Sequence, residues 1–445
     1  MKKKTVKFFS FLFVAITLFV NTAVSTSASG NTIDAFGEEM EFSNKARAIY
    51  LYSTNANKVL FSTGDNEIMD VGPIAKVMTG LIACETLSDR LHTPVNITTQ
   101  MVNGVSGNSM QLKDGMTLEI EDLLFGTICG GNNDAAQAIA MICESNISAF
   151  VQRMNAYASE LGMTNTHFSN PTGLDDTPSQ TTISDVAKLV KKASKNELYM
   201  KISSAKSRKI SDEITVLNRN ALISQFSDQR YYNKNAKGII AGSTNSSGYT
   251  VATYADNGNT SYICIVMGAV AEADHTYSYY IANKLIDFAF NNFSSKKIIS
   301  ANDDVYYTKV KSSLSPKNNS EFACTVPDDV YAFVENNVDI KNNIQYKFYL
   351  HDSVLNAPIS ANTIVGGLDI YCNGELVATS ELIMKDEVKK NNILFFLNNT
   401  KQFLLSRYFI IFVVICIPSV LVYLYLDYIR TRHKKVNTVR FKRFY

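Results

Sequence analysis

Apolar positions in the first two thirds of the chain recur at strand spacing at both ends and at helical spacing between them. Residues 48–52 and 59–61 predict a hairpin with a turn at Asn55–Asn57. Helical patterns cover residues 75–87, residues 121–145 with a break at Gly130-Gly131, residues 147–161, and residues 184–192 with Ser184 as N-cap. Strands follow at residues 238–242, 250–255 and 261–270. This order predicts an α+β domain over residues 46–293 whose terminal strands share one sheet.

Beyond residue 293 the pattern changes to short strands separated by turn residues. The strands are expected at residues 305–310, 321–326, 330–335, 345–350, 367–371 and 376–382. They predict an all-β domain over residues 300–388. Residues 391–407, which are polar as far as Lys401, are interpreted as a stalk.

The amino terminus has the features of a secretory signal over residues 1–28. Four lysines within the first seven residues precede an apolar run from Phe8 to Val20, and small residues follow up to Ala28. Such a segment is cleaved after export, and the alternative is an uncleaved anchor.

The carboxyl terminus predicts a transmembrane helix over residues 408–426. These 19 residues contain no charge, about the length needed to cross the hydrocarbon core. Pro418 within them is tolerated in lipid. Residues 427–445 carry seven basic side chains, which by the positive-inside rule stay in the cytoplasm. A buried core helix is the alternative. We therefore expect a single-pass membrane protein with its bulk outside the cytoplasm.

Charge and cysteine content limit the partners and cofactors that the sequence predicts. The 445 residues have a formal net charge of +2, but residues 1–28 carry +4 and residues 427–445 carry +6, which leaves −8 for the body. An acidic body argues against a nucleic-acid partner. The seven cysteines are scattered without the spacing of metal ligands, so they are interpreted as buried small hydrophobes, and neither a metal nor a cofactor is predicted.

Seven short phrases of the chain together point to one known family. They are Ala75–Thr79, Leu123–Gly126, Asn133–Ala136, Met163–Phe168, Asn170–Asp176, Gly248–Thr250 and Ala357–Ile359. The chain resembles the low-molecular-mass penicillin-binding proteins, the serine-type D-alanyl-D-alanine carboxypeptidases of peptidase family S11. The resemblance spans about residues 46–388. It implies a β-lactamase- or transpeptidase-like α+β domain, a small all-β domain and a C-terminal membrane anchor.

The resemblance also implies a chemistry of acyl transfer that uses three motifs. In S-x-x-K, the serine attacks the substrate carbonyl and the lysine one helical turn later takes its proton. S-x-N relays protons and holds the substrate amide. K-T-G supplies a cation and a hydroxyl for the terminal carboxylate. The implied substrate is the stem peptide of peptidoglycan.

The reactive groups are missing at the positions that match these motifs. Pro73 stands at the nucleophile, three residues before Lys76. Proline suits the first turn of a helix but has no hydroxyl. Gly131 stands at the serine of the second motif, with Asn133 at its asparagine. The third motif is replaced by Ile240, Ala241 and Gly242, which precede Ser243. Lys76 is expected to have a structural role.

Other groups near these motifs are interpreted as structural. The literal Ser106-Gly107-Asn108 lies ahead of the expected helix, and Ser109 and Ser243 have no lysine three residues later. Cys129 is interpreted as a buried helix residue. Asp175 and Asp176 are expected to cap a turn and the next helix.

Three hypotheses remain open. The favoured one is a membrane-anchored, catalytically inactive homologue that binds peptidoglycan stem peptide weakly or binds another envelope protein. The second is an active D-Ala-D-Ala carboxypeptidase that uses displaced residues. The third is a structural module that interacts with partners at the membrane surface.

Overall fold

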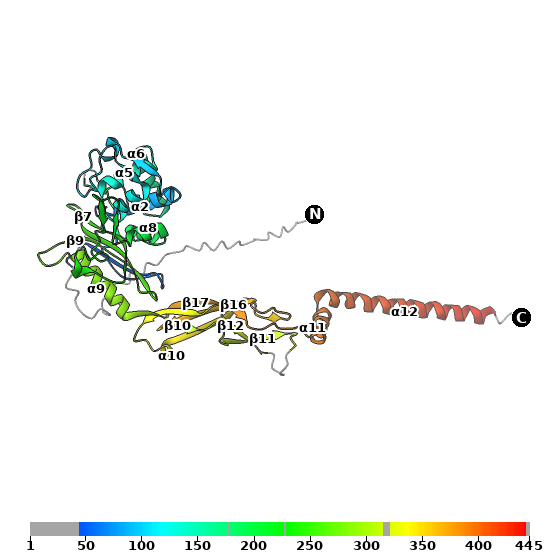
Figure 1. The fold of residues 1–445 in the computed structure, drawn as a ribbon. Coiled ribbons are helices and arrows are strands. Elements are labelled where there is room, and N and C mark those ends of the chain that lie inside the picture. Colours follow the sequence, from blue (N-terminus) through cyan, green and yellow to red (C-terminus); the bar gives the residue numbers. More distant parts are fainter. Residues whose placement is uncertain (1–43, 176–177, 227, 315–320, 442–445) are drawn as a thin grey trace, which may run out of the picture. The chain divides into compact units, whose positions relative to one another are not determined.

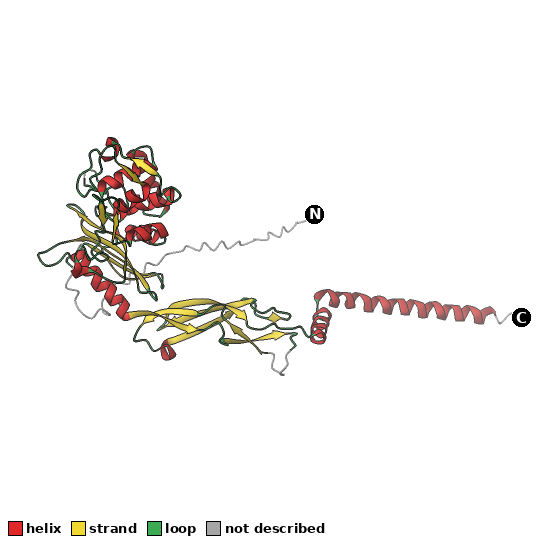
Figure 2. Ribbon diagram, in the orientation of Figure 1, coloured by secondary structure: helices red, strands yellow, loops and turns green. Residues whose placement is uncertain are grey.

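The computed structural model describes residues 44–175, 178–226, 228–314 and 321–441, which form two compact units (Figures 1 and 2). The first unit extends to Asn257 and includes Ser261–Ile286. The second comprises Gly258–Thr260 and the chain from Asp287 onward. The signal segment predicted over residues 1–28 lies outside the described residues.

The first unit contains a five-stranded antiparallel sheet. Its strands are β1 (Ala48–Ser53), β2 (Lys58–Thr63), β7 (Ala236–Thr244), β8 (Gly248–Asp256) and β9 (Ser261–Ala269), in the order β2-β1-β9-β8-β7. The first and last strands of the block therefore share one sheet, as the sequence predicts. Strand β7 lies at the edge of this sheet, where its outer side is free of a neighbouring strand of the sheet.

Helix α2 (Ile74–Leu87) is the centre of the first unit, because almost all of its side chains are buried. It packs against α4 (Ile120–Ile128), α5 (Asn133–Cys143), α6 (Ile147–Glu160), α7 (Ile183–Ala193), α8 (Glu197–Ser203) and strand β7. The remaining elements are β3 (Pro94–Asn96), α3 (Thr99–Val102), β4 (Thr117–Glu119), β5 (Ser207–Lys209), β6 (Thr215–Leu217), a 3₁₀ turn η1 (Gln229–Tyr231) and α9 (Tyr277–Asn292).

One predicted helix start needs correction. The N-cap of α7 is Thr182, whose side chain accepts a hydrogen bond from the Asp185 backbone N–H. Ser184 lies inside the first turn, and its hydroxyl donates to the Asp65 carbonyl at 2.9 Å. The break predicted at Gly130-Gly131 is confirmed, because it separates α4 from α5.

The second unit is built of short strands, as predicted. A six-stranded sheet has the order β14-β16-β17-β12-β11-β15, and a second sheet pairs β10 with β13. The strands are β10 (Phe293–Ile299), β11 (Tyr306–Lys311), β12 (Glu321–Thr325), β13 (Val330–Glu335), β14 (Ile344–Leu350), β15 (Leu355–Asn356), β16 (Ile364–Cys372) and β17 (Glu375–Met384), with α10 (Ile340–Asn343) between β13 and β14. Strands β10 and β15 are additions to the prediction.

Two helices end the described chain. The segment interpreted as a polar stalk forms helix α11 (Asn392–Leu404), followed by α12 (Arg407–Phe441). Of the described residues, Arg407–Arg432 is the stretch whose length and apolar composition would suffice to cross a membrane. It contains the segment predicted over residues 408–426.

Candidate functional site

A cavity of about 360 Å³ in the first unit gathers the motif positions singled out in the sequence. Its walls come from the start of α2, the start of α5, strand β7 and the loop that follows Asn170. The predicted positions that line it are Pro73, Lys76, Gly131, Asn133, Ile240, Ala241, Gly242 and Ser243. Residues far apart in the sequence thus meet at one site.

Pro73 lies at the N-cap of α2, with a φ of −61° that suits its ring. It is buried against strand β7, since a Cβ placed on Gly242 would lie 3.0 Å from the Pro73 Cβ. Proline carries no hydroxyl and no backbone N–H. At this point of the cavity the chain therefore offers neither a nucleophile nor a main-chain hydrogen-bond donor.

Lys76 follows one turn later and is only 7% exposed. Its Nζ donates to the Thr172 carbonyl at 2.6 Å. Burial, together with the positive charge of Arg219, lowers the Lys76 pKa from its ordinary value of 10.5 to about 7. In the described part of the chain no carboxylate forms an ion pair with it. The lysine is thus poised to lose its proton near neutral pH, although no hydroxyl stands at position 73.

Gly131 and Asn133 connect α4 to α5 at the cavity wall. Gly131 has a φ of +61°, and a Cβ built there would have its nearest neighbours 3.9 Å and 4.0 Å away. There is room for a side chain, but the backbone conformation favours glycine. The Asn133 Nδ2 donates to the Ser106 carbonyl at 2.7 Å. Its Oδ1 is buried and has no hydrogen-bond partner among the residues that the structure describes.

Strand β7 carries the three residues that the family resemblance aligns with the third motif. Ile240 and Ala241 are buried, and Ile240 is part of the main hydrophobic core. Ser243 is exposed at the cavity rim. Strand β7 is an edge strand, so its outer side pairs with no further strand of this sheet.

The loop after Asn170 holds the carbonyl that Lys76 binds. The Asn170 Oδ1 accepts hydrogen bonds from the backbone N–H groups of Thr172 and Gly173, at 3.1 Å and 2.6 Å. Asp175 accepts from the Thr244 hydroxyl at 2.7 Å and from the Ser246 N–H at 3.1 Å, and so caps the turn between β7 and β8. The prediction for Asp175 is a cap on a turn and on the next helix; the turn that it caps in the structure is the distant one between β7 and β8. Asp176 lies outside the described residues.

Arg219, which no sequence pattern predicts as a site residue, lines the same cavity. It is exposed, and among the described residues its guanidinium forms no ion pair. Its carbonyl accepts a hydrogen bond from the Tyr279 hydroxyl at 3.0 Å. The sequence around it, Asn218-Arg219-Asn220, matches no expected motif, and only the structure shows that two buried asparagines flank one exposed cation.

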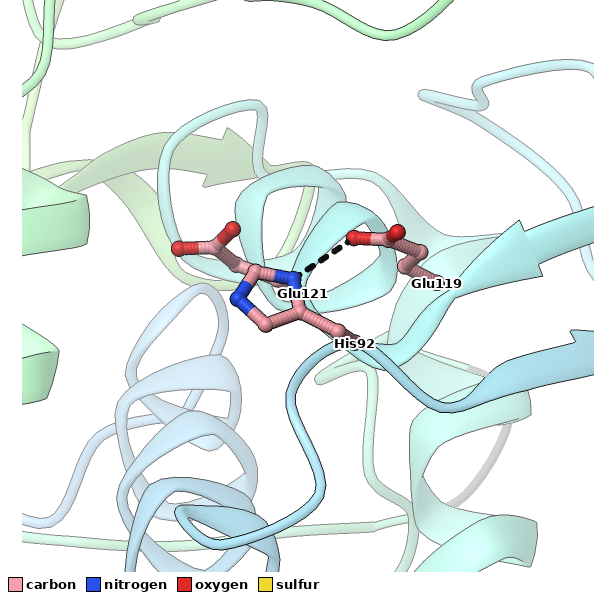
Figure 3. A group of neighbouring side chains, drawn as sticks. All are labelled: His92, Glu119 and Glu121. Carbon is pink, nitrogen blue, oxygen red and sulfur yellow. Dashed lines mark hydrogen bonds and ion pairs between the residues drawn. The ribbon is translucent and has the colours of Figure 1, made fainter.

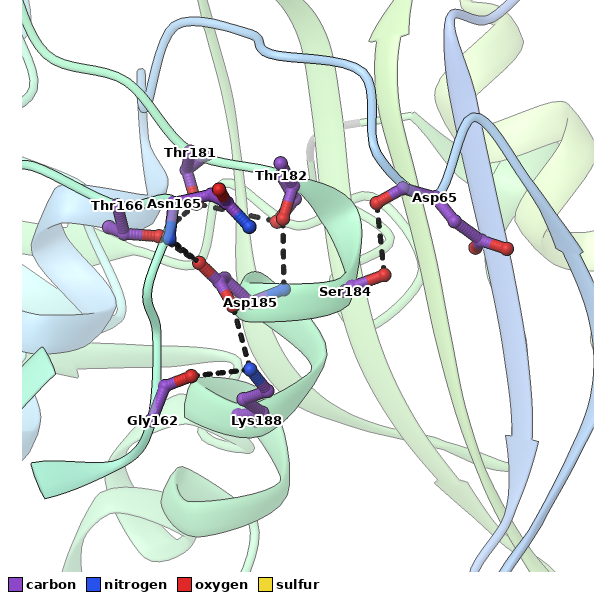
Figure 4. A network of polar contacts seen from close by, with 9 residues as sticks. All are labelled: Asp65, Gly162, Asn165, Thr166, Thr181, Thr182, Ser184, Asp185 and Lys188. Atoms are coloured by element: carbon purple, nitrogen blue, oxygen red, sulfur yellow. Dashed lines mark hydrogen bonds and ion pairs between the residues drawn. The ribbon is translucent and has the colours of Figure 1, made fainter. Parts of the chain in front are cut away.

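Two buried aspartates organise the structure behind the cavity. Asp134 accepts from the Ser109 hydroxyl at 2.7 Å and from the backbone N–H groups of Met110 and Leu112, each at 3.0 Å. Asp185 binds the Asn165 N–H, the Thr166 hydroxyl and the Lys188 ammonium (Figure 4). These contacts fix the loops that lead into the cavity walls.

Two of the groups that the sequence analysis interprets as structural, Ser109 and Cys129, have side-chain partners in the structure. Ser109 is committed to Asp134, and it also accepts from the Gln111 N–H at 2.7 Å. Burial raises the pKa of the Cys129 thiol to about 12, so it is a poor nucleophile. All seven cysteines are free.

His92, Glu119 and Glu121 form a group whose ligand atoms lie within 4.8 Å of one another (Figure 3). His92 Nδ1 lies 3.0 Å from Glu119, which raises the histidine pKa. Glu121 already faces Arg208 at 3.0 Å and Lys201 at 3.4 Å. Since two cations compensate Glu121, we interpret the group as an ion-pair cluster that ties α4 to α8 and β5.

Family models cover most of the described chain. A model described as D-alanyl-D-alanine carboxypeptidase matches residues 35–271, more than half of the sequence. A second, described as penicillin-binding protein 5, C-terminal domain, matches residues 293–390. The first match lies largely in the first unit and the second match lies in the second unit, in the order that the sequence predicts.

Curated relatives align along nearly their whole length. The chain is 26% identical over 371 residues to the D-alanyl-D-alanine carboxypeptidase DacF of Bacillus subtilis, which covers 81% of this chain and 90% of that protein. It is 26% identical over 358 residues to DacC of Escherichia coli, at 78% and 84% coverage.

Solved structures share the fold. Penicillin-binding protein 5 from Haemophilus influenzae matches with a TM-score of 0.59 and 23% identity, over 78% of this chain and 98% of that one. A peptidoglycan synthesis regulatory factor (PBP3) from Streptococcus pneumoniae matches with a TM-score of 0.61 and 19% identity, over 77% and 99%. The predicted fold class, an α+β domain followed by an all-β domain, is confirmed.

Proposed function

Since the chain belongs to the D-alanyl-D-alanine carboxypeptidase family and so to the proteins of cell-wall metabolism, we propose that it has kept the family's cavity for binding and lost its covalent chemistry. The observation that carries this proposal is Pro73 at the start of α2. It removes the hydroxyl that the family resemblance places there, while the helix itself begins normally.

Acyl transfer needs a nucleophile, a base and donors for the developing oxyanion. Pro73 can be neither nucleophile nor main-chain donor. Ile240 and Ala241 supply neither the cation nor the hydroxyl of the third motif. Lys76 could act as a base near neutral pH, but it has no hydroxyl at position 73 to deprotonate. The reaction therefore lacks its first step.

Non-covalent binding requires no nucleophile, and the site contains groups that can bind a peptide. The exposed guanidinium of Arg219 suits a carboxylate, and the unpartnered Asn133 Oδ1 suits a ligand N–H. The free edge of β7 can pair with an extended peptide. A peptide with a free carboxyl terminus, such as the peptidoglycan stem peptide, combines all three features.

The location of this binding module follows from the chain ends. We propose that the segment over residues 1–28 directs export and that α12 anchors the protein in the cytoplasmic membrane through residues 408–426. The basic residues 427–445 would then remain inside the cell and both units outside it.

The test is a titration of the full-length protein in detergent with a muropeptide that ends in D-Ala-D-Ala, followed by calorimetry and by assay of free D-alanine. We expect saturable binding without release of D-alanine. Arg219→Gln should weaken binding about tenfold, the size of one charge-assisted hydrogen bond. Lys206→Gln removes an exposed cation outside the cavity and is the matched control.

Each other outcome favours one of the alternatives. Release of D-alanine would show an active carboxypeptidase with displaced groups and would overturn the proposal. Absence of saturable binding would leave a structural module or a site for another envelope protein, and it would equally overturn the peptide-binding role.

A further inference from the structure

A second hollow of the first unit, the side groove, adjoins the cavity that holds the motif positions and has a volume of about 660 Å³. Its walls come from residues 108–116, from the connection between α4 and α5, and from residues 213–219, which include β6. Asn108 and Arg219 line both spaces. The cavity and the side groove therefore adjoin at Arg219.

Asn132 places an uncommitted carboxamide at this groove. It is the N-cap of α5, yet its side chain makes no capping hydrogen bond, and in the described part of the chain it makes no other. The residue is only 7% exposed, and it lines the groove. A Cβ built on Gly130 would lie 2.1 Å from the Asn132 Oδ1, so the glycine leaves the carboxamide its place. A buried carboxamide normally has hydrogen-bond partners, and a ligand with peptide groups would supply them.

Two side chains of opposite charge, Lys113 and Glu213, line the groove from two different loops. Both are exposed, and among the described residues neither forms an ion pair, with the other or elsewhere. Apolar surface comes from Met110, Ile214 and Leu217. The lining thus combines a carboxamide, an aliphatic surface and two unpaired charges of opposite sign.

The position of the groove limits its ligand. In the proposed function Arg219 binds the carboxylate at the end of a stem peptide, and D-Ala-D-Ala has no atoms beyond that carboxylate except a methyl group. A peptide end alone would therefore leave the side groove unfilled.

A cross-linked peptide extends further. In a cross-link, the D-alanine carbonyl is bonded to the side-chain amine of a diamino acid in a second stem. Where that residue is a diamino-dicarboxylic acid, such as diaminopimelate, the carbon that bears the amine also bears a carboxylate. An aliphatic chain then leads from this carbon to the second stem. Such a ligand offers a carboxylate to Arg219 and further atoms to the groove that adjoins it.

We propose that the side groove binds the second stem of a cross-linked peptide pair whose linking residue is a diamino-dicarboxylic acid. The linking carboxylate takes the place of the terminal carboxylate at Arg219, and the aliphatic chain lies on the apolar surface of the groove. Asn132 then binds a peptide group of the second stem, Lys113 its free carboxylate and Glu213 its N–H groups. This inference rests on the proposed function and narrows its ligand from free stem peptides to cross-linked ones.

The test is calorimetry of the full-length protein in detergent with three probes. They are a monomeric muropeptide that ends in D-Ala-D-Ala, a dimer of tetrapeptide stems cross-linked through diaminopimelate, and the corresponding dimer cross-linked through lysine, which lacks the linking carboxylate. We expect the diaminopimelate dimer to bind about tenfold more tightly than either other probe. The double variant Lys113→Gln/Glu213→Gln should remove this advantage and leave the affinity for the monomer unchanged. Lys206→Gln, which is exposed and outside both spaces, is the matched control.

The outcomes separate this inference from the proposed function. Equal affinities for the monomer and the diaminopimelate dimer, or a dimer affinity that the double variant leaves unchanged, would overturn the role of the side groove, while saturable binding of the monomer would uphold the proposed function. Equal affinities for the two dimers would overturn the assignment of the linking carboxylate to Arg219 and with it the ligand class. Absence of saturable binding for all three probes would overturn the proposed function and this inference together.

Discussion

The polar groups that fix the loops next to the cavity and the motif positions that line it differ in their hydrogen bonding. Asp134, Asn170 and Asp185 each accept several hydrogen bonds that fix the surrounding loops. Pro73 and Ile240, on the facing elements, offer no reactive group. Asn133 and Asp134 are neighbours in the chain, yet one has an unpartnered oxygen and the other is fully engaged. Side chains that stabilise the fold and side chains at the motif positions are thus distinct, even where they are neighbours in the chain.

The largest effect should come from the scaffold. Asp134→Ala leaves the buried N–H groups of Met110 and Leu112 without an acceptor, so we expect a loss of ~2–5 kcal/mol in the free energy of unfolding. Urea denaturation measures it, and Asp134→Asn, which keeps one acceptor oxygen, should lose less. If Asp134→Ala lowered the free energy of unfolding by less than Pro73→Ala does, the contrast between the loop-fixing groups and the motif positions would be wrong.

Lys76 is both a buried residue with a structural hydrogen bond and a motif position. Its titration should make the free energy of unfolding depend on pH. Its pKa is lowered to about 7 in the folded protein, so the unfolded chain binds more protons between about pH 7 and 10.5. Stability therefore rises with pH in that window, by at most about 1.4 kcal/mol per unit. Between pH 7 and 9 this amounts to ~2–3 kcal/mol, which Lys76→Met should abolish. Lys206→Met, at an exposed site, should leave the slope unchanged; equal slopes in the wild type and Lys76→Met would contradict the account.

A smaller effect is expected at Gly131. Its φ of +61° costs a non-glycine residue about 1–2 kcal/mol, whereas the open space around it adds no clash. Gly131→Ser should lower the unfolding free energy by that amount. This backbone conformation therefore does not suit the serine that the family resemblance places at position 131. A neutral or stabilising Gly131→Ser would show that the position still accommodates it.

The smallest effect is expected at the nucleophile position. Pro73 contributes neither a side-chain hydrogen bond nor a main-chain N–H, so Pro73→Ala should change stability by less than about 1 kcal/mol. Thermal unfolding measures it. A loss comparable to that of Asp134→Ala would mean that Pro73 is itself part of the scaffold.

The sequence predicts most of the elements but only part of the site. Helix α2 and the sheet follow from the periodicity, whereas the motif positions around Lys76 and Gly131, which converge in the cavity, are marked only by the resemblance to the family. Arg219 escapes, because it belongs to no expected motif and reaches the cavity only through the folding of the loop around it. Helix α11 is missed because the asparagines between residues 391 and 401 led to the interpretation of a polar stalk. Local pattern does not reveal contacts formed by distant chain segments.

The most direct test of the central claim is covalent labelling of the full-length protein with a fluorescent penicillin, followed by denaturing electrophoresis. Because Pro73 stands where the family resemblance places the nucleophile, we predict no adduct at any concentration that saturates an active family member. A labelled band that disappears on Ser243→Ala, or on substitution of another named serine of the cavity, would contradict the account and show that this cavity still performs acyl transfer.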